Sequence, residues 1–556
     1  MTDPVLFRGG IIRTMDGAVI GDPEPPEAVL IHEGRVAAVG TEGSCRAVSP
    51  RTPREIDLDG RTLMPGFIDA HAHLLLHGCR LDWADLSAAR SASEIIRLLQ
   101  QHADKHPDLG VIRGYGYDQS LLAGGGHPTA RELDQAGAGR PVMIQHVSGH
   151  GYAVSSAVLQ DSGITALTPD PPGGSIGRDL DGTPDGRIFD SACDMLSGPA
   201  GVKIGNHGPN FHLPMPAAEI ARLHDLAQKS FLAAGITTIC DAQVTSRELG
   251  AYLTARDQGR LRLRAELLML SSNLEQLREI GLSSRLGDAR LATAGVKLYA
   301  DGSVIARTAL LDDCCGEGNG SGYLYHDPAE LKRLIIEARR LGLPTATHAQ
   351  GGGAIAIVLD AIGASCGQSS PARMPHRIEH CGFPDSEQIT RMRELGIVPV
   401  PQPLQVHERA DALISELGEY GGSFYPYGQF EAAGLPVIIS SDAPVTDPAP
   451  LRAAWAAITR QTRSGATAGP SQLRASRRAA LLGLTAAPAR LLGRDDIGLI
   501  TPGRRADLVL LDADPCTVPV TDLPRIAVTE TWIDGEPVWN AASFSPIAPE
   551  WPALSG

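Results

Sequence analysis

The sequence predicts an α/β protein: a (β/α)8 TIM barrel, a composite β-sandwich domain built from both termini, and an α/β insertion after the first barrel strand. Three observations lead to this prediction. Eight short apolar segments alternate with helical stretches through the middle of the chain. The first two of these segments are separated by far more residues than one helix needs, and both ends of the chain carry short apolar runs broken by glycine.

The two ends of the chain share one pattern. Apolar runs at 5–7, 28–31 and 36–39 are separated by glycine-containing turns, and 507–512 and 531–535 repeat the pattern. Short runs of β-type residues bounded by such turns are typical of strands. Neither end is long enough to form a sandwich alone, so we predict one domain from residues 1–60 and 495–556.

The middle of the chain has the rhythm of βα units, and eight such units predict a closed parallel barrel. A helix with an apolar period near 3.6 is expected over 329–341, after Asp327-Pro328, and another over 217–234. The barrel domain is predicted to comprise residues 61–84 and 206–494. Its strands are expected at 63–73, 235–241, 263–270, 295–299, 345–349, 377–381, 397–401 and 435–442.

Residues 85–205 separate the first two barrel strands and are too many for an ordinary βα connection. We therefore predict an inserted domain that caps the pocket of the barrel. Within it, Asp181-Gly182 and Asp185-Gly186 each predict a hairpin turn.

Composition excludes several functional classes. The 556 residues include 49 Lys and Arg against 64 Asp and Glu, a net charge of −15, which argues against nucleic-acid or anionic-membrane partners. No apolar run is long enough to cross a membrane, and the residues after Met1 do not form a signal peptide, so a cytoplasmic protein is expected. Nine cysteines without a C-x-x-C pair fit a reducing compartment.

Ligand-type side chains stand at the ends of the predicted barrel strands. His71 and His73 are two residues apart on a strand, so both can point to one face. The active sites of barrel enzymes lie at the carboxyl ends of the strands. The further residues found at those ends are Lys297, His348, His380 and Asp442. Four histidines, a lysine and an aspartate at one face predict a metal site.

The motifs around these residues resemble the amidohydrolase superfamily of metal-dependent hydrolases. Within it, the chain is most similar to the YtcJ-like branch (amidohydrolase family 3), which includes N-substituted formamide deformylases. The resemblance runs in order along nearly the whole chain. It is carried by Pro65-Gly66-Phe67-Ile68-Asp69-Ala70-His71-Ala72-His73, by 295–303, 347–349, 377–381, 440–444 and 503–508, and in the insertion by 127–134 and 148–150.

The resemblance implies a ligand set. His71, His73 and Asp442 would hold one metal, and His348 and His380 a second, with Lys297 as a carboxylated lysine between them. Imidazole and carboxylate ligands suit Zn²⁺, one or two per chain, with another divalent metal as the alternative. For Lys297 the alternative is an ammonium group that pairs with Asp301 or with a substrate carboxylate.

The resemblance also implies hydrolysis of a small-molecule amide by metal-activated water. Asp442 would act as general base and then general acid. His150 is the candidate for binding the substrate oxygen, with a purely structural histidine as the alternative, and Asp301 is also expected at the substrate. A formamide or N-acyl amine is the expected substrate, and the family suggests a homodimer. Alternatives are a cyclic amide, lactone or ester substrate, or, in a different class, a non-catalytic regulatory or binding protein on this scaffold.

Three features depart from the pattern or compete with it. Gly351, Gly352 and Gly353 follow His348-Ala349-Gln350, where relatives carry an acidic residue. Ser148 and Ser155 stand where relatives tend to carry Asp and Asn. These changes predict an altered substrate preference. A nucleophile elbow is formally present around Ser175. It needs a preceding strand and a following helix, and the flanking Pro171-Pro172 and Asp181-Gly182 argue against both.

Overall fold

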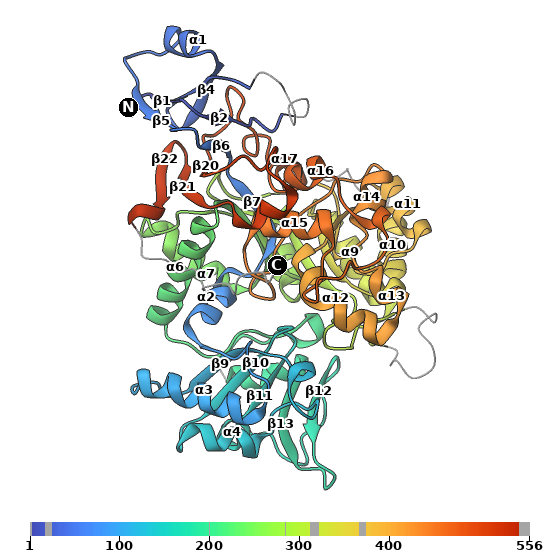
Figure 1. The fold of residues 1–556 in the computed structure, drawn as a ribbon. Coiled ribbons are helices and arrows are strands. Elements are labelled where there is room, and N and C mark those ends of the chain that lie inside the picture. Colours follow the sequence, from blue (N-terminus) through green and yellow to red (C-terminus); the bar gives the residue numbers. More distant parts are fainter. Residues whose placement is uncertain are drawn as a thin grey trace.

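A computed structural model describes residues 3–16, 25–198, 201–283, 285–311, 322–365 and 374–543. Figure 1 shows the arrangement: a barrel surrounded by helices lies in the middle, two sheets made by the chain termini lie at one end, and the inserted sheet lies at the opposite end. No helix in these ranges is long and apolar enough to cross a membrane.

The barrel contains seven strands, all parallel to their neighbours, at seven of the eight predicted positions. The chain belongs to the TIM-barrel class, as predicted. In spatial order the strands are β7 (Phe67–Ala72), β14 (Ile236–Val244), β15 (Arg264–Leu270), β16 (Leu291–Tyr299), β17 (Thr345–Ala349), β18 (Arg377–His380) and β19 (Val398–Val400).

The eighth predicted strand, 435–442, forms no regular strand, and its Ile439 N–H donates to the Gly483 carbonyl at 3.1 Å. It meets β7 only at its carboxyl end, where Asp442 N donates to His71 O at 2.7 Å and Ala443 forms a parallel bridge with Ala72. Earlier in β7, the Ile68 N–H bonds instead to the carbonyl of Leu484, at 2.8 Å. The turn after α16 (Arg477–Leu482) thus takes the hydrogen bonds that a regular eighth strand would have made.

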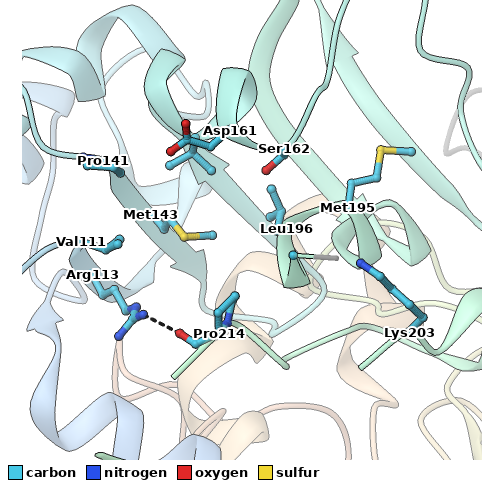
Figure 2. Close-up of a pocket in the computed structure, with 12 residues that line it drawn as sticks. Val111, Arg113, Pro141, Met143, Asp161, Ser162, Met195, Leu196, Lys203 and Pro214 are labelled. Carbon is cyan, nitrogen blue, oxygen red and sulfur yellow. Dashed lines mark hydrogen bonds between the residues drawn. The ribbon is translucent and has the colours of Figure 1, made fainter. Parts of the chain in front are cut away.

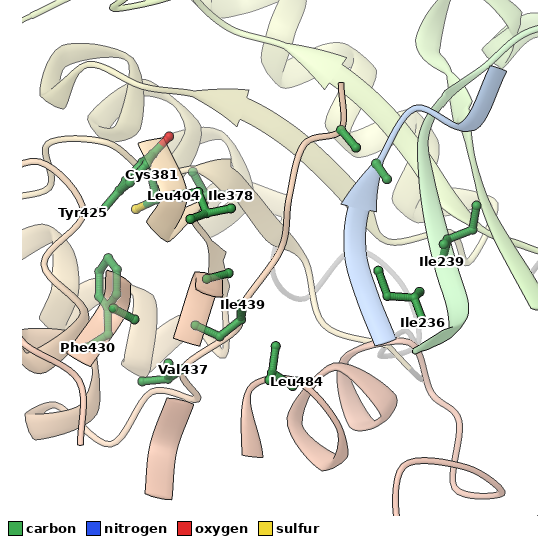
Figure 3. Close-up of a cluster of buried hydrophobic side chains, with 14 of the residues drawn as sticks. Ile236, Ile239, Ile378, Cys381, Leu404, Tyr425, Phe430, Val437, Ile439 and Leu484 are labelled. Carbon is green, nitrogen blue, oxygen red and sulfur yellow. The ribbon is translucent and has the colours of Figure 1, made fainter. Parts of the chain in front are cut away.

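Helices cover the barrel and form one large apolar core with its strands. Figure 3 shows part of this core around Ile236, Ile378, Phe430 and Ile439. A separate cluster fills the barrel interior, where Ile68 and Cys240 pack against Ala489 of α17 (Ala486–Leu491). The other helices here are α2 (Leu74–Asp82), α6 (Ala217–Ala233), α7 (Ser246–Asp257), α8 (Leu274–Glu279), α9 (Pro328–Arg340), α10 (Gly352–Ser365), α11 (Ser386–Leu395), α12 (Pro403–Leu417), α13 (Glu419–Gly422), α14 (Tyr427–Ala432) and α15 (Pro450–Thr459).

The strand predicted over 63–73 is two strands, because the chain changes sheets at Gly66. A Cβ at this residue would lie 2.3 Å from the Thr237 side chain, so only glycine permits so close an approach to β14. The first part, β6 (Thr62–Pro65), pairs with β2 (Ile11–Ile12) and β20 (Leu508–Leu511) in a terminal sheet. The barrel proper therefore begins at Phe67.

The terminal regions form two sheets, β4-β3-β1-β5 from the N-terminal region alone and β2-β6-β20-β21-β22 from both ends of the chain. The two sheets share a core that includes Phe7, Ile31, Leu63 and Trp532. Buried Arg264 at the start of β15 binds Asp507 and Asp534, so an ion pair ties this region to the barrel. The remaining terminal elements are β1 (Val5–Arg8), β3 (Ala28–His32), β4 (Arg35–Gly40), α1 (Glu42–Ala47), β5 (Arg54–Asp57), β21 (Val528–Ile533) and β22 (Glu536–Asn540).

The insertion forms a six-stranded sheet of its own, in the order β12-β13-β11-β10-β9-β8. Asp181-Gly182 makes the turn between β12 and β13, as predicted. The turn predicted at Asp185-Gly186 is wrong, because both residues lie within β13, where the Asp185 carboxylate accepts the Arg187 N–H. The elements are β8 (Ala84–Asp85), α3 (Ala92–Lys105), β9 (Ile112–Tyr117), α4 (Ala130–Gly137), β10 (Val142–His146), β11 (Gly151–Val154), α5 (Ser156–Asp161), β12 (Gly174–Arg178) and β13 (Pro184–Asp190).

Candidate active site

Three of the predicted metal ligands converge at the carboxyl end of the barrel. His71 lies in β7, His73 follows that strand as the N-cap residue of α2, and Asp442 ends the eighth segment. Asp442 Oδ1 is 3.4 Å from His71 Nε2 and 3.2 Å from His73 Nε2. Their potential ligand atoms all lie within 4.8 Å of one another, and in the described ranges no other group of His, Cys, Asp or Glu does so.

The donor atoms of this cluster suit a divalent cation. Lys297 Nζ, His71 Nε2 and His73 Nδ1 are buried without a hydrogen-bond partner in the described part of the chain. A buried polar atom without a partner costs free energy, so natural structures usually satisfy it. Imidazole nitrogens beside an ionised carboxylate are the donor set that a divalent metal such as Zn²⁺ prefers.

Asp442 is ionised in this setting. Burial alone would raise its pKa, but the neighbouring His71, His73 and His380 hold the pKa well below its usual value. Asp442 and His380 both have left-handed backbones, with φ of 55° and 66°. Such conformations cost on the order of 1–3 kcal/mol for residues other than glycine and concentrate at functional sites.

Lys297 lies in β16 and is fully buried. Its Nζ is 4.5 Å from the ring centroid of Tyr299, and among the described residues it makes no ion pair with Asp301 or another carboxylate. Burial lowers its pKa to about 8, so its neutral form is accessible near neutral pH. The protonated form still predominates at pH 7, but among the described residues it has no hydrogen-bonded partner of the kind that the alternative of a paired ammonium group requires.

His348 and His380 end the neighbouring strands β17 and β18, and their ring centroids are 4.4 Å apart. His380 Nδ1 is 3.9 Å from Asp442 Oδ2 and 2.8 Å from Gln402 Oε1. His348 Nε2 contacts the Gly302 carbonyl at 2.8 Å. Both residues therefore lie beside the His71–His73–Asp442 cluster, but each has one ring nitrogen engaged elsewhere.

Glu379 is a functional residue that the sequence prediction missed. Its carboxylate contacts His71 Nδ1 and accepts hydrogen bonds from the Arg377 guanidinium, with a distance of 2.8 Å from Arg377 Nη2. Burial would raise the pKa of Glu379, but Arg377 and His71 hold it well below its usual value. This contact leaves Nε2 of His71 to face Asp442. The clue in the sequence was the acidic residue that directly precedes His380.

A second carboxylate holds the eighth segment against β7. Asp69 accepts hydrogen bonds from Ser441 Oγ at 2.5 Å and from Ser441 N at 3.1 Å. This bond fixes the residue directly before Asp442. The closure of the barrel at this point is therefore made by side chains as well as by the backbone.

His150 reaches the barrel from the insertion. Its ring centroid is 5.7 Å from that of His348, and its Nδ1 is 2.8 Å from Asp190 Oδ1. The hydroxyl of Tyr325, from the barrel, donates to the same Asp190 oxygen. The structure thus places His150 beside His348, and its contact with the substrate stays a prediction.

Asp301 is placed differently from the other predicted residues. It is fully buried, and both its oxygens accept backbone N–H groups, from Gln350 and Gly351 at 3.0 Å and from Leu310 at 2.9 Å. The carboxylate braces the loop after β16 against the end of β17, and its Oδ1 also lies 3.7 Å from His348 Nε2. A contact between Asp301 and the substrate stays a prediction.

The glycines that replace the acidic residue have a packing role. A Cβ on Gly351 would lie 1.8 Å from the carbonyl oxygen of Leu310, so a side chain there would push the braced loop away. The two serine departures are also local: Ser148 Oγ contacts His146 Nδ1 at 2.7 Å, and Ser155 Oγ accepts the Val142 N–H at 3.0 Å. None of these contacts disturbs the metal-ligand cluster.

The insertion contains a cavity of about 450 Å³ that has no predicted ligand in its wall. Figure 2 shows it: apolar side chains such as Met143 and Leu196 line it, and Arg113 donates to the Pro214 carbonyl at 2.9 Å. Ser175 lies elsewhere, in β12 opposite Phe189. It is part of an antiparallel pair and not of a strand-to-helix turn, so the nucleophile elbow is absent.

Comparison with known proteins agrees with this geometry. The profile of the amidohydrolase family matches residues 54–539. N-substituted formamide deformylase of Arthrobacter pascens is 29% identical over 92% of this chain and 94% of its own length. Putative amidohydrolase YtcJ of Bacillus subtilis (strain 168) is 28% identical over 96% of this chain and 99% of its own length.

A solved structure supports the same conclusion. The crystal structure of an uncharacterized metal-dependent hydrolase from Pyrococcus horikoshii OT3 superposes with a TM-score of 0.75 at 25% identity, covering 93% of this chain and 99% of that one. With a histidine pair and an aspartate at the barrel mouth and a family profile that spans most of its length, this chain belongs to the amidohydrolase family, on the YtcJ-like side that its motifs resemble.

Proposed function

We propose that this amidohydrolase, a hydrolase of carbon–nitrogen bonds other than peptide bonds, cleaves the amide bond of a small molecule of the formamide or N-acyl amine type. The observation that carries the proposal is the convergence of His71, His73 and Asp442 within 4.8 Å at the active face of the barrel. The similarity to N-substituted formamide deformylase supports the substrate type.

His71, His73 and Asp442 would hold a divalent ion, with Zn²⁺ as the first choice for this donor set. Such an ion supplies Lewis acidity, which acidifies a water molecule and polarises a carbonyl group. The protein orients the side chains that would bind this ion. Glu379 contacts Nδ1 of His71 and so holds the ring with Nε2 toward Asp442, in the way that outer carboxylates orient ligand imidazoles.

Asp442 is the proposed proton carrier. Its carboxylate is ionised and lies at the centre of the cluster, so one oxygen can accept a proton from the attacking water and later give it to the departing nitrogen. The backbone N–H of Asp442 is bound to His71 O, which keeps the carboxylate in place during both transfers.

His150 is the proposed donor to the substrate oxygen. Its Nδ1 contacts Asp190 Oδ1, which orients the ring, and the proposed role needs the ring proton on Nε2. A hydrogen bond from this group would strengthen as negative charge grows on the carbonyl oxygen.

A second ion is part of the proposal. His348 and His380 offer the nitrogens that are not bound to Gly302 O and Gln402, respectively. Neutral Lys297 can add CO₂, forming an N–C bond and releasing one proton, and the resulting carbamate would supply oxygen ligands between the two positions.

The experiment measures metal content and substrate range together. Purified protein is stripped with a chelator, titrated with Zn²⁺ or Mn²⁺, and assayed for amine release from N-substituted formamides and N-acyl amines, with lactams, lactones and esters alongside. We expect about one or two ions per chain and turnover of the open-chain amides. Turnover of lactams or esters alone would overturn the substrate class.

The non-catalytic alternative has its own readout. His71→Ala and His73→Ala should abolish both tight metal binding and turnover. A wild-type protein that binds less than about one divalent ion per chain and hydrolyses none of the compounds would favour a binding or regulatory protein.

A further inference from the structure

Two histidines lie about one turn apart at the carboxyl end of α3, in the insertion. His102 is in the last turn of this helix, and His106 is its C-cap residue. Side chains four positions apart lie on the same side of a helix. The two ring centroids are accordingly 4.7 Å apart, with 42° between the ring planes. We call these two residues the α3 histidine pair.

The α3 histidine pair lies outside the proposed active site. α3 packs on the inserted sheet through Ile95 and Leu99, and Figure 1 shows the helix on the outside of the insertion. The proposed metal ligands of the barrel lie instead at the mouth of the barrel and are buried. His106 is exposed and His102 is half-buried, so both rings can be reached from solvent.

The ring nitrogens of the pair are not used within the protein. In the described part of the chain, neither imidazole makes a hydrogen bond or an ion pair. Another close pair differs in this respect. His207 and His326 have ring centroids 4.9 Å apart, but His207 Nδ1 contacts Ser271 Oγ at 2.8 Å. The α3 histidine pair therefore retains its nitrogen atoms for a ligand from solution.

The separation of the two rings suits a metal ion bound by both. An ion about 2.0 Å from one nitrogen of each imidazole lies about 3.2 Å from each ring centroid. Two centroids 4.7 Å apart then subtend about 95° at the ion. This angle is nearer to the right angle of a tetragonal ion such as Cu²⁺ or Ni²⁺ than to the angle of about 109° in a tetrahedral Zn²⁺ site.

The surroundings keep the pair in the form that binds metals. Burial and the neighbouring His106 lower the pKa of His102, while Asp82 and Lys105 act on it in opposite directions. Neutral imidazole is the ligand form of histidine. The carboxyl end of a helix also carries a partial negative charge, which attracts cations.

We propose that the α3 histidine pair is a separate surface site for a tetragonal transition-metal ion, Cu²⁺ before Ni²⁺, with water in the remaining ligand positions. Cu²⁺ stands above both Ni²⁺ and Zn²⁺ in the general order of affinity for such ligands. The inference does not rest on the proposed function, because the pair lies outside the proposed active site.

Retention on immobilised Cu²⁺–iminodiacetate tests the site, because a resin-bound ion reaches only the surface of the protein. The wild type without an affinity tag should be retained. His102→Asn and His106→Asn should each elute at an imidazole concentration at least about fivefold lower, because one ligand of the chelating pair is lost. His32→Asn is the matched control: it removes a single imidazole, 28% exposed, from β3 and should elute with the wild type.

Affinity in solution is measured by titrating Cu²⁺ into protein that has been loaded with Zn²⁺ and desalted, with electron paramagnetic resonance as the readout. The wild type should give a tetragonal Cu²⁺ spectrum with splitting from nitrogen ligands. Each single variant should bind Cu²⁺ at least about tenfold more weakly.

Three results would overturn the inference. The first is a wild type that passes through the column, or variants that elute with it. The second is loss of retention in only one of the two variants, which would assign binding to a single imidazole. The third is a Cu²⁺ affinity in solution that is unchanged in both variants.

Discussion

The substitution Glu379→Gln tests how the barrel holds its first metal ligand. Glu379 is fully buried and is bound by His71 and Arg377, whose side chain is only 5% exposed. Glutamine keeps the shape of the side chain but removes its charge. Arg377 then remains buried without its counter-ion, and Nδ1 of His71 loses its carboxylate acceptor.

Two magnitudes follow from these contacts. Removing one partner of a buried ion pair costs about 3–5 kcal/mol of folding stability. Loss of an outer carboxylate that orients a ligand imidazole typically weakens metal binding by about 10–100-fold. The second effect corresponds to about 1.4–2.8 kcal/mol of binding free energy.

Glu266→Gln provides the matched control. Glu266 is equally buried and pairs with Arg494 and Arg285, both at 2.6 Å, but it lies near the amino end of β15, away from the ligand cluster. Both variants should unfold at lower temperature. Only Glu379→Gln should weaken Zn²⁺ binding, as measured by competition with a chromogenic chelator.

A Zn²⁺ affinity of Glu379→Gln within about twofold of the wild type would refute the proposed role of Glu379. An equal loss of Zn²⁺ affinity in Glu266→Gln would refute it as well, because the loss would then be a general consequence of destabilisation. Restoration by Glu379→Asp of part of the affinity would support the role of the charge.

The remaining predictions concern the proton carrier, the buried lysine, the domain junction and the insertion. Asp442→Asn should lower kcat by at least about 100-fold, because it removes the proposed base, in a protein whose circular dichroism is unchanged. In metal-free protein, Lys297 loses its proton at a lower pH in the folded state (pKa about 8) than in the unfolded state (10.5). The difference in stability to urea between the wild type and Lys297→Met should therefore shift in favour of the wild type by up to about 3 kcal/mol between pH 8 and 10.5, and a difference that stays constant would contradict the assigned burial effect. Asp507→Asn should cost about 3–5 kcal/mol of stability by leaving Arg264 partly unpaired, with kcat of the folded fraction unchanged. His150→Leu should reduce kcat more than Zn²⁺ affinity, and an equal loss of both would refute its assignment to the substrate oxygen.

The order of the barrel strands, and the strand ends that carry the ligand-type residues, could be predicted from the sequence alone. Apolar runs such as Thr345–Ala349 are strands because their residues are β-type and bounded by turns, and these local properties survive in any tertiary context. His71 and His73 could be identified because the two-residue period of a strand already places them together. The long spacing between the first two strands was enough to predict an insertion.

The contacts between these segments could be seen only in the folded chain. Glu379 acts on His71, 308 residues earlier in the chain, and no local pattern could pair them. The eighth segment has strand-like residues, but the Leu484 carbonyl accepts the β7 hydrogen bond that a regular strand would have made. The oxygens of Asp301 accept backbone N–H groups from Leu310, Gln350 and Gly351. Hydrogen bonds and cavities between elements depend on which surfaces come into contact, and that depends on the packing of the whole chain.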